Sequence, residues 1–183
     1  EEDSIIIFTS DHGFHLGQHE LWQKGDLFEG SLHLPLIIKV PGMKRKGEAA
    51  KGVVELLDLY PTILEMARIK VPRQSQGKSL LPLLSDPHAE IRKASFSMAL
   101  GRAGRVHREW AWRHIMGYSI RTGRYRYTEY GENGEWGQEL YDYEQDPNEY
   151  ENRAKEKYSP TWARMRHLLH QRKADAKKEV KGL

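Results

Sequence analysis

The stretch FTSDHGFHLGQHELWQKGDLFEGSLHLPLIIKVPG, residues Phe8–Gly42, decides how this chain is interpreted. It places an acid, several histidines, glycines and a lysine directly after a β-branched apolar run. That run, SIIIFTS at Ser4–Ser10, and a second one, LPLIIKV at Leu34–Val40, favour strands buried on both faces, as in a parallel sheet. In open α/β sheets, ligands bind just beyond the carboxyl ends of strands, so the residues after Ser10 are expected to form a site.

The turn after the first expected strand contains the strongest candidates for chemistry. Asp11 and His12 come one step past that strand, and Gly13 lets the backbone turn sharply. A carboxylate beside an imidazole can ligate a metal, and it can equally be a capping aspartate next to a surface histidine. Lys24 follows in the same loop, where its compact positive charge can hold an anionic group or be solvated.

Three further ionisable residues of the stretch leave their roles open. His15 and His19 lie between His12 and Lys24 and could be general acids, substrate contacts or loop surface. Glu29 precedes the second expected strand. We expect it to pair with a nearby cation or to cap a helix, which is a structural role.

The next part of the chain predicts one clear helix. DLYPTILEMARI, Asp58–Ile69, has Asp58 as a good N-cap and a proline in its first turn. KSLLPLLSDP, residues 78–87, predicts a short helix or turn. The apolar face of the first helix is expected to consist of Leu59, Ile63, Met66 and Ala67.

From about Ala94 the pattern changes to short, aromatic, alternating segments that predict antiparallel strands. These segments are SFSMAL (95–100), HIMGYSIRT (114–122) and YRYTEYG (125–131), followed by a hairpin loop, a short strand within 139–154 and a turn at Asp146-Pro147. A final helix is expected over about Thr161–Lys178. Its apolar side is predicted to carry Trp162, Met165, Leu168 and Leu169.

This order predicts the α/β class and two parts. Residues 1–93 are expected to be the C-terminal part of a catalytic α/β domain, with a mixed sheet and flanking helices. Residues 94–183 are expected to form a small α+β subdomain with an antiparallel sheet.

Composition limits the possible functions. The 183 residues suffice for one ordinary domain or two small ones, and the net charge of +3 gives only a weak preference for anionic ligands. The absence of cysteine excludes disulfides, cysteine-ligated zinc and a cysteine nucleophile within these residues. No apolar run reaches the roughly 20 residues that a membrane span needs. We expect neither a membrane span nor a nucleic-acid partner.

The quoted stretch resembles the sulfatase family of the alkaline phosphatase superfamily, in particular its iduronate-2-sulfatase-like branch. In that branch a Ser-Asp-His-Gly turn is followed by Leu-Gly-x-His and Trp-x-Lys. The later segments VVELLDLYPTILEMARIKVP, QGKSLLPLL, RTGRYRYTEY and ELYDYEQDPNEYENRA resemble the helix, loop and C-terminal strands of the same family. The resemblance therefore covers about Ser4–Ala154.

The resemblance implies an activity and a role for each candidate. Asp11 and His12 would ligate a calcium ion, and Lys24 would contact the sulfate as a catalytic and substrate-binding residue. A formylglycine, made from Cys or Ser in a Cys/Ser-x-Pro-x-Arg motif, would attack sulfur as its hydrate. The substrate would be a sulfated carbohydrate, with His15 and His19 as candidate contacts, in a periplasmic, secreted or lysosomal-type compartment.

The nucleophile motif is missing from these residues, which contain no cysteine and no Ser-x-Pro-x-Arg. The chain also begins abruptly, with EEDS leading at once into the first apolar run. We therefore expect the C-terminal portion of a sulfatase, whose upstream part supplies the nucleophile and most calcium ligands. The segment alone is expected to be inactive.

Two alternatives stay open. The first is a phosphonate monoester or phosphodiester hydrolase of the same superfamily, with a different upstream nucleophile and metal. The second is a non-catalytic fragment that binds anionic glycans through its mildly basic second half, in which Arg102, Arg105, Arg108 and Arg113 lie close in sequence.

Overall fold

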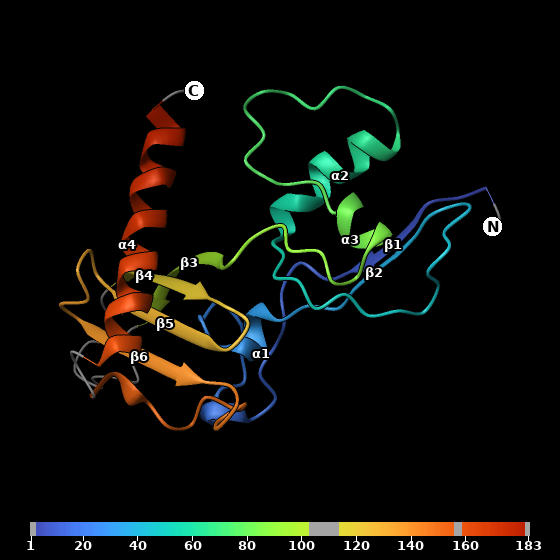
Figure 1. Cartoon of the computed structure of the whole chain (residues 1–183). Coiled ribbons are helices and arrows are strands. Elements are labelled where there is room, and N and C mark those ends of the chain that lie inside the picture. The colour runs from blue at the N-terminus through green and yellow to red at the C-terminus, as the bar shows by residue number, and fades with distance from the viewer. Residues whose placement is uncertain (1–2, 103–113, 156–158, 182–183) are drawn as a thin grey trace.

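The computed structural model describes residues 3–102, 114–155 and 159–181 (Figure 1). Helices are labelled α, 3-10 helices η and strands β. The elements are β1 (Ile6–Thr9), η1 (Gln18–Glu20), α1 (Glu29–Leu32), β2 (Leu36–Lys39), η2 (Leu56–Asp58), α2 (Leu59–Met66), α3 (Leu81–Ser85), β3 (Ser95–Arg102), β4 (His114–Arg121), β5 (Tyr125–Tyr130), β6 (Gly137–Asp142), η4 (Arg153–Lys155) and α4 (Pro160–Lys181).

The four later strands form an antiparallel sheet in the order β3-β4-β5-β6, which confirms the predicted strand run. The register places Ser119 opposite Thr128, and Thr128 opposite Glu139. Because side chains alternate along a strand, these three residues share one face of the sheet. Their chain neighbours Ile120 and Leu140 lie on the other face.

Helix α4 covers the face that carries Ile120 and Leu140. Met165 and Leu169 are fully buried there and pack in one cluster with Tyr127. The predicted final helix and its apolar side are confirmed. Within the described ranges, no helix is long and apolar enough to span a membrane.

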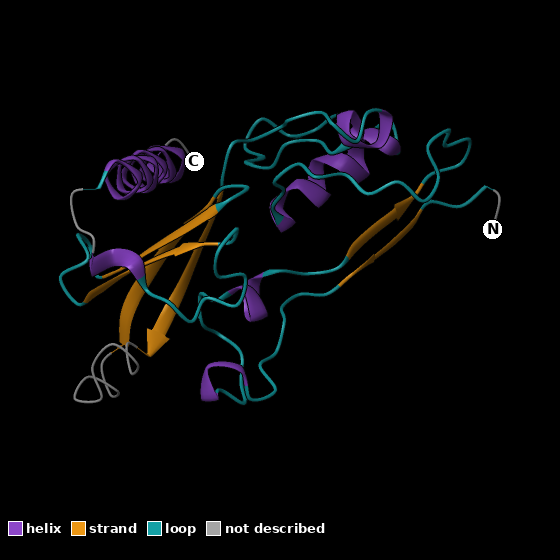
Figure 2. Cartoon of the chain, turned by 60° about the horizontal axis from the view of Figure 1, so that its bottom comes forward, coloured by secondary structure: helices purple, strands orange, loops and turns teal. Residues whose placement is uncertain are grey.

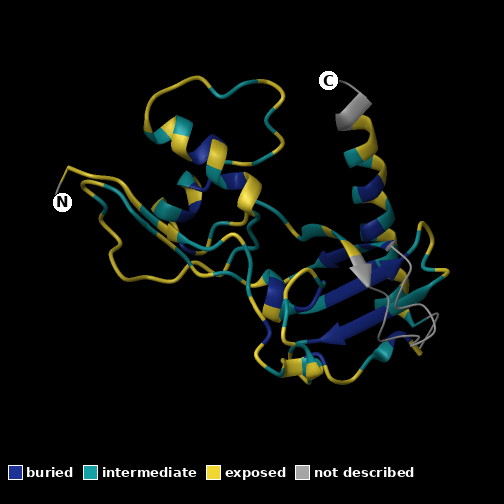
Figure 3. Cartoon of the chain, turned by 180° about the vertical axis from the view of Figure 1, so that it is seen from behind, coloured by how far each residue is buried: buried dark blue, intermediate teal, exposed yellow. Residues whose placement is uncertain are grey.

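The opposite face of the sheet is covered by the segment that leads into α1. Leu27 is 2% exposed and packs against Ile115 and Tyr130. Figure 3 shows that buried residues concentrate on the strands of this sheet, whereas the arm containing β1 and β2 is mostly half-buried or exposed. The sheet is therefore enclosed between α4 and a segment of the quoted stretch.

The two apolar runs form β1 and β2, but their predicted parallel arrangement is wrong. They pair antiparallel, with Ile7 opposite Ile38, and the pair projects away from the larger sheet (Figure 2). Phe8 and Ile37 are 60% and 63% exposed. A continuous apolar run indicates a strand without fixing its direction, and the chain between the two runs turns back through α1 without a long crossover helix.

The helix predicted over Asp58–Ile69 is shorter and buries a different side. Its α-helical part, α2, ends at Met66, and Arg68 has a positive φ of 57°. Pro61 and Thr62 are buried, whereas Ile63, on the predicted apolar face, is 46% exposed.

Asp58 precedes α2 but does not cap it through its side chain. Its carboxylate instead accepts from the backbone N–H groups of Glu55 and Lys78 and pairs with Arg92. The predicted short helix over 78–87 is confirmed as α3.

Candidate functional site

The turn after β1 is organised by local hydrogen bonds. The Ser10 hydroxyl donates to the His12 carbonyl at 2.9 Å, and the His12 N–H donates to Asp11 Oδ1 at 3.1 Å. Gly13 donates its N–H to the Ser31 carbonyl at 2.9 Å. A Cβ at Gly13 would lie 2.0 Å from the Gly30 carbonyl oxygen, so only glycine permits this close approach of the turn to α1.

Asp11, His12 and Lys24 are brought together at this turn. The Lys24 Nζ lies 2.6 Å from His12 Nε2, and Asp11 Oδ2 lies 3.5 Å from the same nitrogen. His12 Nδ1 lies 2.8 Å from the Gly13 carbonyl. Because a carbonyl can only accept, Nδ1 carries the proton, and Nε2 of a neutral ring accepts from the Lys24 ammonium.

The Asp11 carboxylate is exposed and anionic. Its side chain is 84% exposed. Desolvation acts against the shift, but hydrogen bonds from the backbone N–H groups of Asp11 and His12, and the positive charge of Lys24, hold the pKa of Asp11 below its usual value. The carboxylate therefore keeps its charge at neutral pH and is free to meet a cation.

The donor set of the turn fits part of a calcium site. Calcium takes about 6–8 oxygen ligands, and an ionised, accessible carboxylate such as Asp11 is a suitable one. His12 Nε2 is a second donor, although Lys24 shares its lone pair in this structure. Among the described residues, no group of three or more His, Cys, Asp or Glu side chains is placed to hold a metal. These two residues could contribute to such a site but cannot complete it.

His15 and His19 lie apart from this group. His15 is 1% exposed, with Nε2 3.1 Å from Asp26 Oδ1, and the ring packs on the Gly30 backbone. His19 is half-buried and stacks on Phe28, with ring centroids 4.1 Å apart. The structure therefore gives His15 a supporting role in the loop, and a direct substrate contact would require this packing to open.

Asp26 is a residue that the sequence interpretation missed. Its Oδ1 accepts from the Phe28 N–H at 3.0 Å and its Oδ2 from the Ser31 hydroxyl at 2.9 Å, in addition to its contact with His15. Asp26 thus joins the part of the loop that contains His15 to α1. The local signal was an aspartate three residues before a helix, where a side chain can accept from the following backbone.

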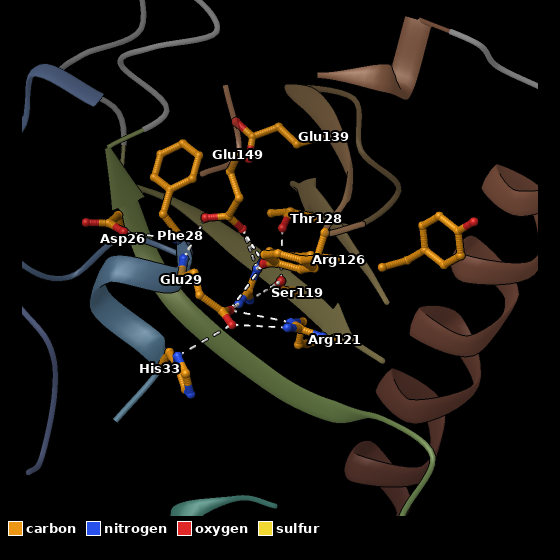
Figure 4. A network of polar contacts seen from close by, with 12 residues as sticks. Asp26, Phe28, Glu29, His33, Ser119, Arg121, Arg126, Thr128, Glu139 and Glu149 are labelled. Atoms are coloured by element: carbon orange, nitrogen blue, oxygen red, sulfur yellow. Dashed lines mark hydrogen bonds and ion pairs between the residues drawn. The ribbon is translucent and has the colours of Figure 1, made fainter. Parts of the chain in front are cut away.

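Glu29 forms the centre of a charged cluster between α1 and the sheet (Figure 4). It pairs with Arg126 and with Arg121, the latter at 3.1 Å. Burial would raise the pKa of Glu29, but the two guanidinium groups outweigh it and hold the pKa below its usual value. The predicted structural role of Glu29 as a partner of a nearby cation is confirmed.

The far side of this cluster is supplied by Glu149. Arg126 Nε donates to Glu149 Oε1 at 2.7 Å, and the Glu29 N–H donates to Glu149 Oε2 at 2.7 Å. The Tyr143 hydroxyl donates to Glu149 Oε1 at 2.6 Å. Arg126 is 2% exposed and Glu149 is 2% exposed, so these charges are satisfied inside the protein. The sequence interpretation identified neither residue.

An open cleft of about 1720 Å³ is lined by residues of the turn after β1 and of the charged cluster around Glu29. Asp11, His12, Glu29, Arg121 and Arg126 all line it. Asp11 and His12 of the turn thus face the same space as the arginines of the Glu29 cluster, and this space is large enough for a ligand.

The predicted arginine patch cannot be placed. Arg105, Arg108 and Arg113 lie outside the described residues, and Arg102 is described only as the last residue of β3.

Comparison with protein families gives one match that covers most of the chain. The model described as "N-sulphoglucosamine sulphohydrolase, C-terminal" matches residues 17–177. Arylsulfatase K of Xenopus laevis is 33% identical over 156 residues, which are 81% of this chain and 27% of that protein. The chain therefore spans about a quarter of the length of the curated relatives it matches.

Solved structures show the same fold over nearly the whole chain. One is BT4656 in complex with its substrate D-glucosamine-2-N,6-O-disulfate, with a TM-score of 0.78 and 29% identity over 97% of this chain and 35% of that one. Another is a phosphonate monoester hydrolase from Silicibacter pomeroyi, with a TM-score of 0.74 and 26% identity over 97% of this chain and 35% of that one. The expected α/β class is confirmed, together with the antiparallel sheet expected in the second part of the chain.

Proposed function

This chain belongs to the sulfatase family, and from that premise we propose that the protein hydrolyses sulfate esters carried by glycans. The observation that supports this proposal is the meeting of Asp11, His12 and Lys24 at one turn, where Asp11 and His12 also line the cleft. Sulfate ester hydrolysis builds negative charge on sulfuryl oxygens and on the leaving oxygen. A site with positive charges fixed in place stabilises that developing charge.

Each residue of the turn has a distinct part in this proposal. Lys24 would hold a sulfate oxygen with its ammonium group, and its contact with His12 orients the side chain toward the turn. Asp11 and His12 would contribute ligands to a calcium ion, which would neutralise sulfuryl oxygen charge when bound. The His12 tautomer suits this role, because its Nδ1 proton is held by the Gly13 carbonyl and Nε2 presents a lone pair.

The nucleophile is proposed to come from outside these residues. The sequence contains no cysteine and no Ser-x-Pro-x-Arg from which a formylglycine could be made. The formylglycine hydrate would supply the oxygen that attacks sulfur. We also propose that the protein works in a periplasmic, secreted or lysosomal-type compartment.

The substrate class is proposed from the relatives. One neighbour is described with a sulfated glucosamine as its substrate, so a sulfated amino sugar or uronic acid within a glycan is the expected ligand. The iduronate-2-sulfatase-like branch stays our proposal within the family, supported by the spacing Leu16-Gly17-x-His19 and Trp22-x-Lys24.

A second candidate is phosphonate monoester hydrolysis. The structural likeness to such an enzyme at 26% identity favours it specifically, and a lysine with a metal-binding turn serves a phosphoryl group as well as a sulfuryl group.

The test is a substrate comparison with the purified full-length protein and added calcium. Release of inorganic sulfate from sulfated glycosaminoglycan disaccharides would be measured beside hydrolysis of an aryl phosphonate monoester. We expect the larger kcat/KM for a sulfated disaccharide. A larger value for the phosphonate would replace the first proposal by the second, and no turnover of either by folded protein would favour a non-catalytic glycan-binding role.

A further inference from the structure

A second, smaller pocket lies beside the edge strand β6, on the face of the sheet opposite α4. It has a volume of about 560 Å³. The loop residues Gly17–Glu20 and the turn at 149–152 close it, and Glu139 and Tyr141 of β6 line it. Because they are two positions apart on one strand, these two side chains share the face opposite Leu140, which packs toward α4.

The walls of this pocket are aromatic. His19 and Phe28 stack with an interplanar angle of 9°, and the Tyr150 ring lies 5.0 Å from the His19 ring. Tyr141 adds a fourth ring, 6.2 Å from Phe28. Tyr150 is 66% exposed and stands at the opening. Aromatic faces attract cations and also stack on sugar rings.

Two polar side chains of the pocket, Glu139 and Tyr141, keep unused hydrogen-bonding capacity toward the described residues. Glu139 is 5% exposed, and in the described part of the chain its hydrogen bonding consists of one long contact, from the Tyr130 hydroxyl to Oε2 at 3.4 Å. Tyr141 is 4% exposed, and its hydroxyl has no hydrogen bond to any described residue. Glu149, by contrast, has both oxygens satisfied by Arg126, Tyr143 and the Glu29 N–H. The pocket therefore offers a buried acceptor and a hydroxyl that the protein itself leaves unused.

Electrostatics favour a positive charge in this space. Burial is the main cause that raises the pKa of Glu139 to about 7, with the like charges of Glu149 and Asp26 adding to it and Arg126 opposing it. A cation placed near the carboxylate would compensate the like charges and the lost hydration. Figure 4 shows Glu139 and Glu149 side by side with Phe28 close to them.

We propose that this pocket binds an organic ammonium group carried on a sugar-sized ring, such as an amino sugar with a free amine. The ammonium would donate to Glu139, the Tyr141 hydroxyl would bond a ring substituent, and the ring would stack on Tyr150. A metal ion is a poorer fit, because the described residues hold no group of three metal-binding side chains. The volume lies within the range of about 300–1,000 Å³ that small-ligand sites occupy.

The proposal goes beyond the proposed sulfatase activity and does not depend on it. Its test is binding of glucosamine, N-acetylglucosamine and glucose to the full-length protein, by isothermal titration calorimetry at pH 7.5. We expect glucosamine to bind at least about tenfold more tightly than the two neutral sugars, because only it carries an ammonium group for a charge-assisted bond. Equal affinities for the three sugars, or no binding of glucosamine, would overturn the proposal.

Single substitutions test whether glucosamine binds in this pocket. Glu139→Gln should remove most of the preference for glucosamine, and Tyr141→Phe should weaken binding with the fold kept. Glu144→Gln is the matched control, since Glu144 is exposed and pairs with Arg124 outside the pocket. An unchanged preference in both Glu139→Gln and Tyr141→Phe would place the ligand elsewhere and overturn the assignment. Competition by calcium ions alone would show an inorganic cation site and would also overturn it.

Discussion

Two groups of charged side chains each contribute residues to the lining of the cleft, and they use similar residue types under opposite conditions of exposure. Asp11 and Lys24 are exposed and hold few contacts beyond their own turn. Arg126 and Glu149 are each 2% exposed, and every charge there has a partner. The first group keeps its charges available to a ligand, whereas the second uses its charges to attach the loop to the sheet.

The exposed turn after β1 has a defined geometry because buried residues hold its backbone in place. The turn at Gly13 is bound to Ser31 of α1, and α1 is fixed to the sheet through Glu29. Asp26 adds a second connection within the loop. The exposed residues are thus positioned by buried ones, an arrangement that keeps the turn accessible while its backbone is fixed.

The largest expected effect is the loss of the buried guanidinium. Arg126→Met should lower the free energy of unfolding by about 3–5 kcal/mol, because Glu29 and Glu149 lose their compensating charge inside the protein. Chemical denaturation followed by circular dichroism measures this. Arg45→Met is the control, since Arg45 forms an exposed pair with Glu48 and should cost about 0–1 kcal/mol. Similar losses in both variants would mean that the buried cluster does not anchor the loop.

The second-largest effect is expected from a substitution in the exposed group, and it should change catalysis without changing stability. Lys24→Ala should reduce kcat for sulfate release by about 10²–10³-fold, as removal of one fixed oxyanion donor does. The free energy of unfolding, measured by thermal denaturation, should stay within about 0.5 kcal/mol of the wild-type value, because Lys24 is a surface side chain. Lys70→Ala removes another exposed lysine far along the chain and should change neither quantity. Full activity of Lys24→Ala would remove Lys24 from the sulfate site.

Asp11→Asn tests the metal part of the same turn. The amide keeps the shape but removes an ionised oxygen ligand, so calcium affinity should fall by about tenfold or more. Calorimetric titration of the full-length protein with calcium measures it, with Asp3→Asn as an exposed control outside the turn. An unchanged calcium affinity would show that Asp11 is not a ligand.

Sequence reasoning reached the residues of the exposed group because they are close along the chain. Asp11, His12 and Lys24 fall within one loop after a recognisable strand, which made them candidates, and the resemblance to the sulfatase family joined them in one expected site. The four-stranded sheet and α4 were also predictable, since alternation and a helical apolar side are local patterns.

The buried cluster was beyond local reasoning. The hydrogen bond from the Glu29 N–H to Glu149 joins residues 120 positions apart, and no spacing rule pairs them. The antiparallel pairing of β1 with β2 was missed for a related reason, because an apolar run does not specify which strand it pairs with or in which direction. Burial of His15 also depended on the Gly30 backbone, which approaches only in the fold.

The smallest expected effect is a difference in pH dependence between Glu139 of the sheet and Glu29 of α1. The pKa of Glu139 is raised to about 7, from 4.5 in an unfolded chain, so the folded state binds more protons between these values. Its contribution to stability is full below about pH 4.5 and is lost as pH rises through 7. The pKa of Glu29 is lowered, so its contribution is present above pH 4.5 and is lost as pH falls.

Denaturation between pH 4.5 and 8 would therefore show a different slope in Glu139→Gln. The difference in unfolding free energy between the wild type and this variant should shrink or reverse as pH rises, because only the wild type loses the protonated acid. Glu144→Gln, at an exposed position, should run parallel to the wild type. Parallel curves for Glu139→Gln as well would show that burial does not raise the pKa of Glu139 in the folded protein.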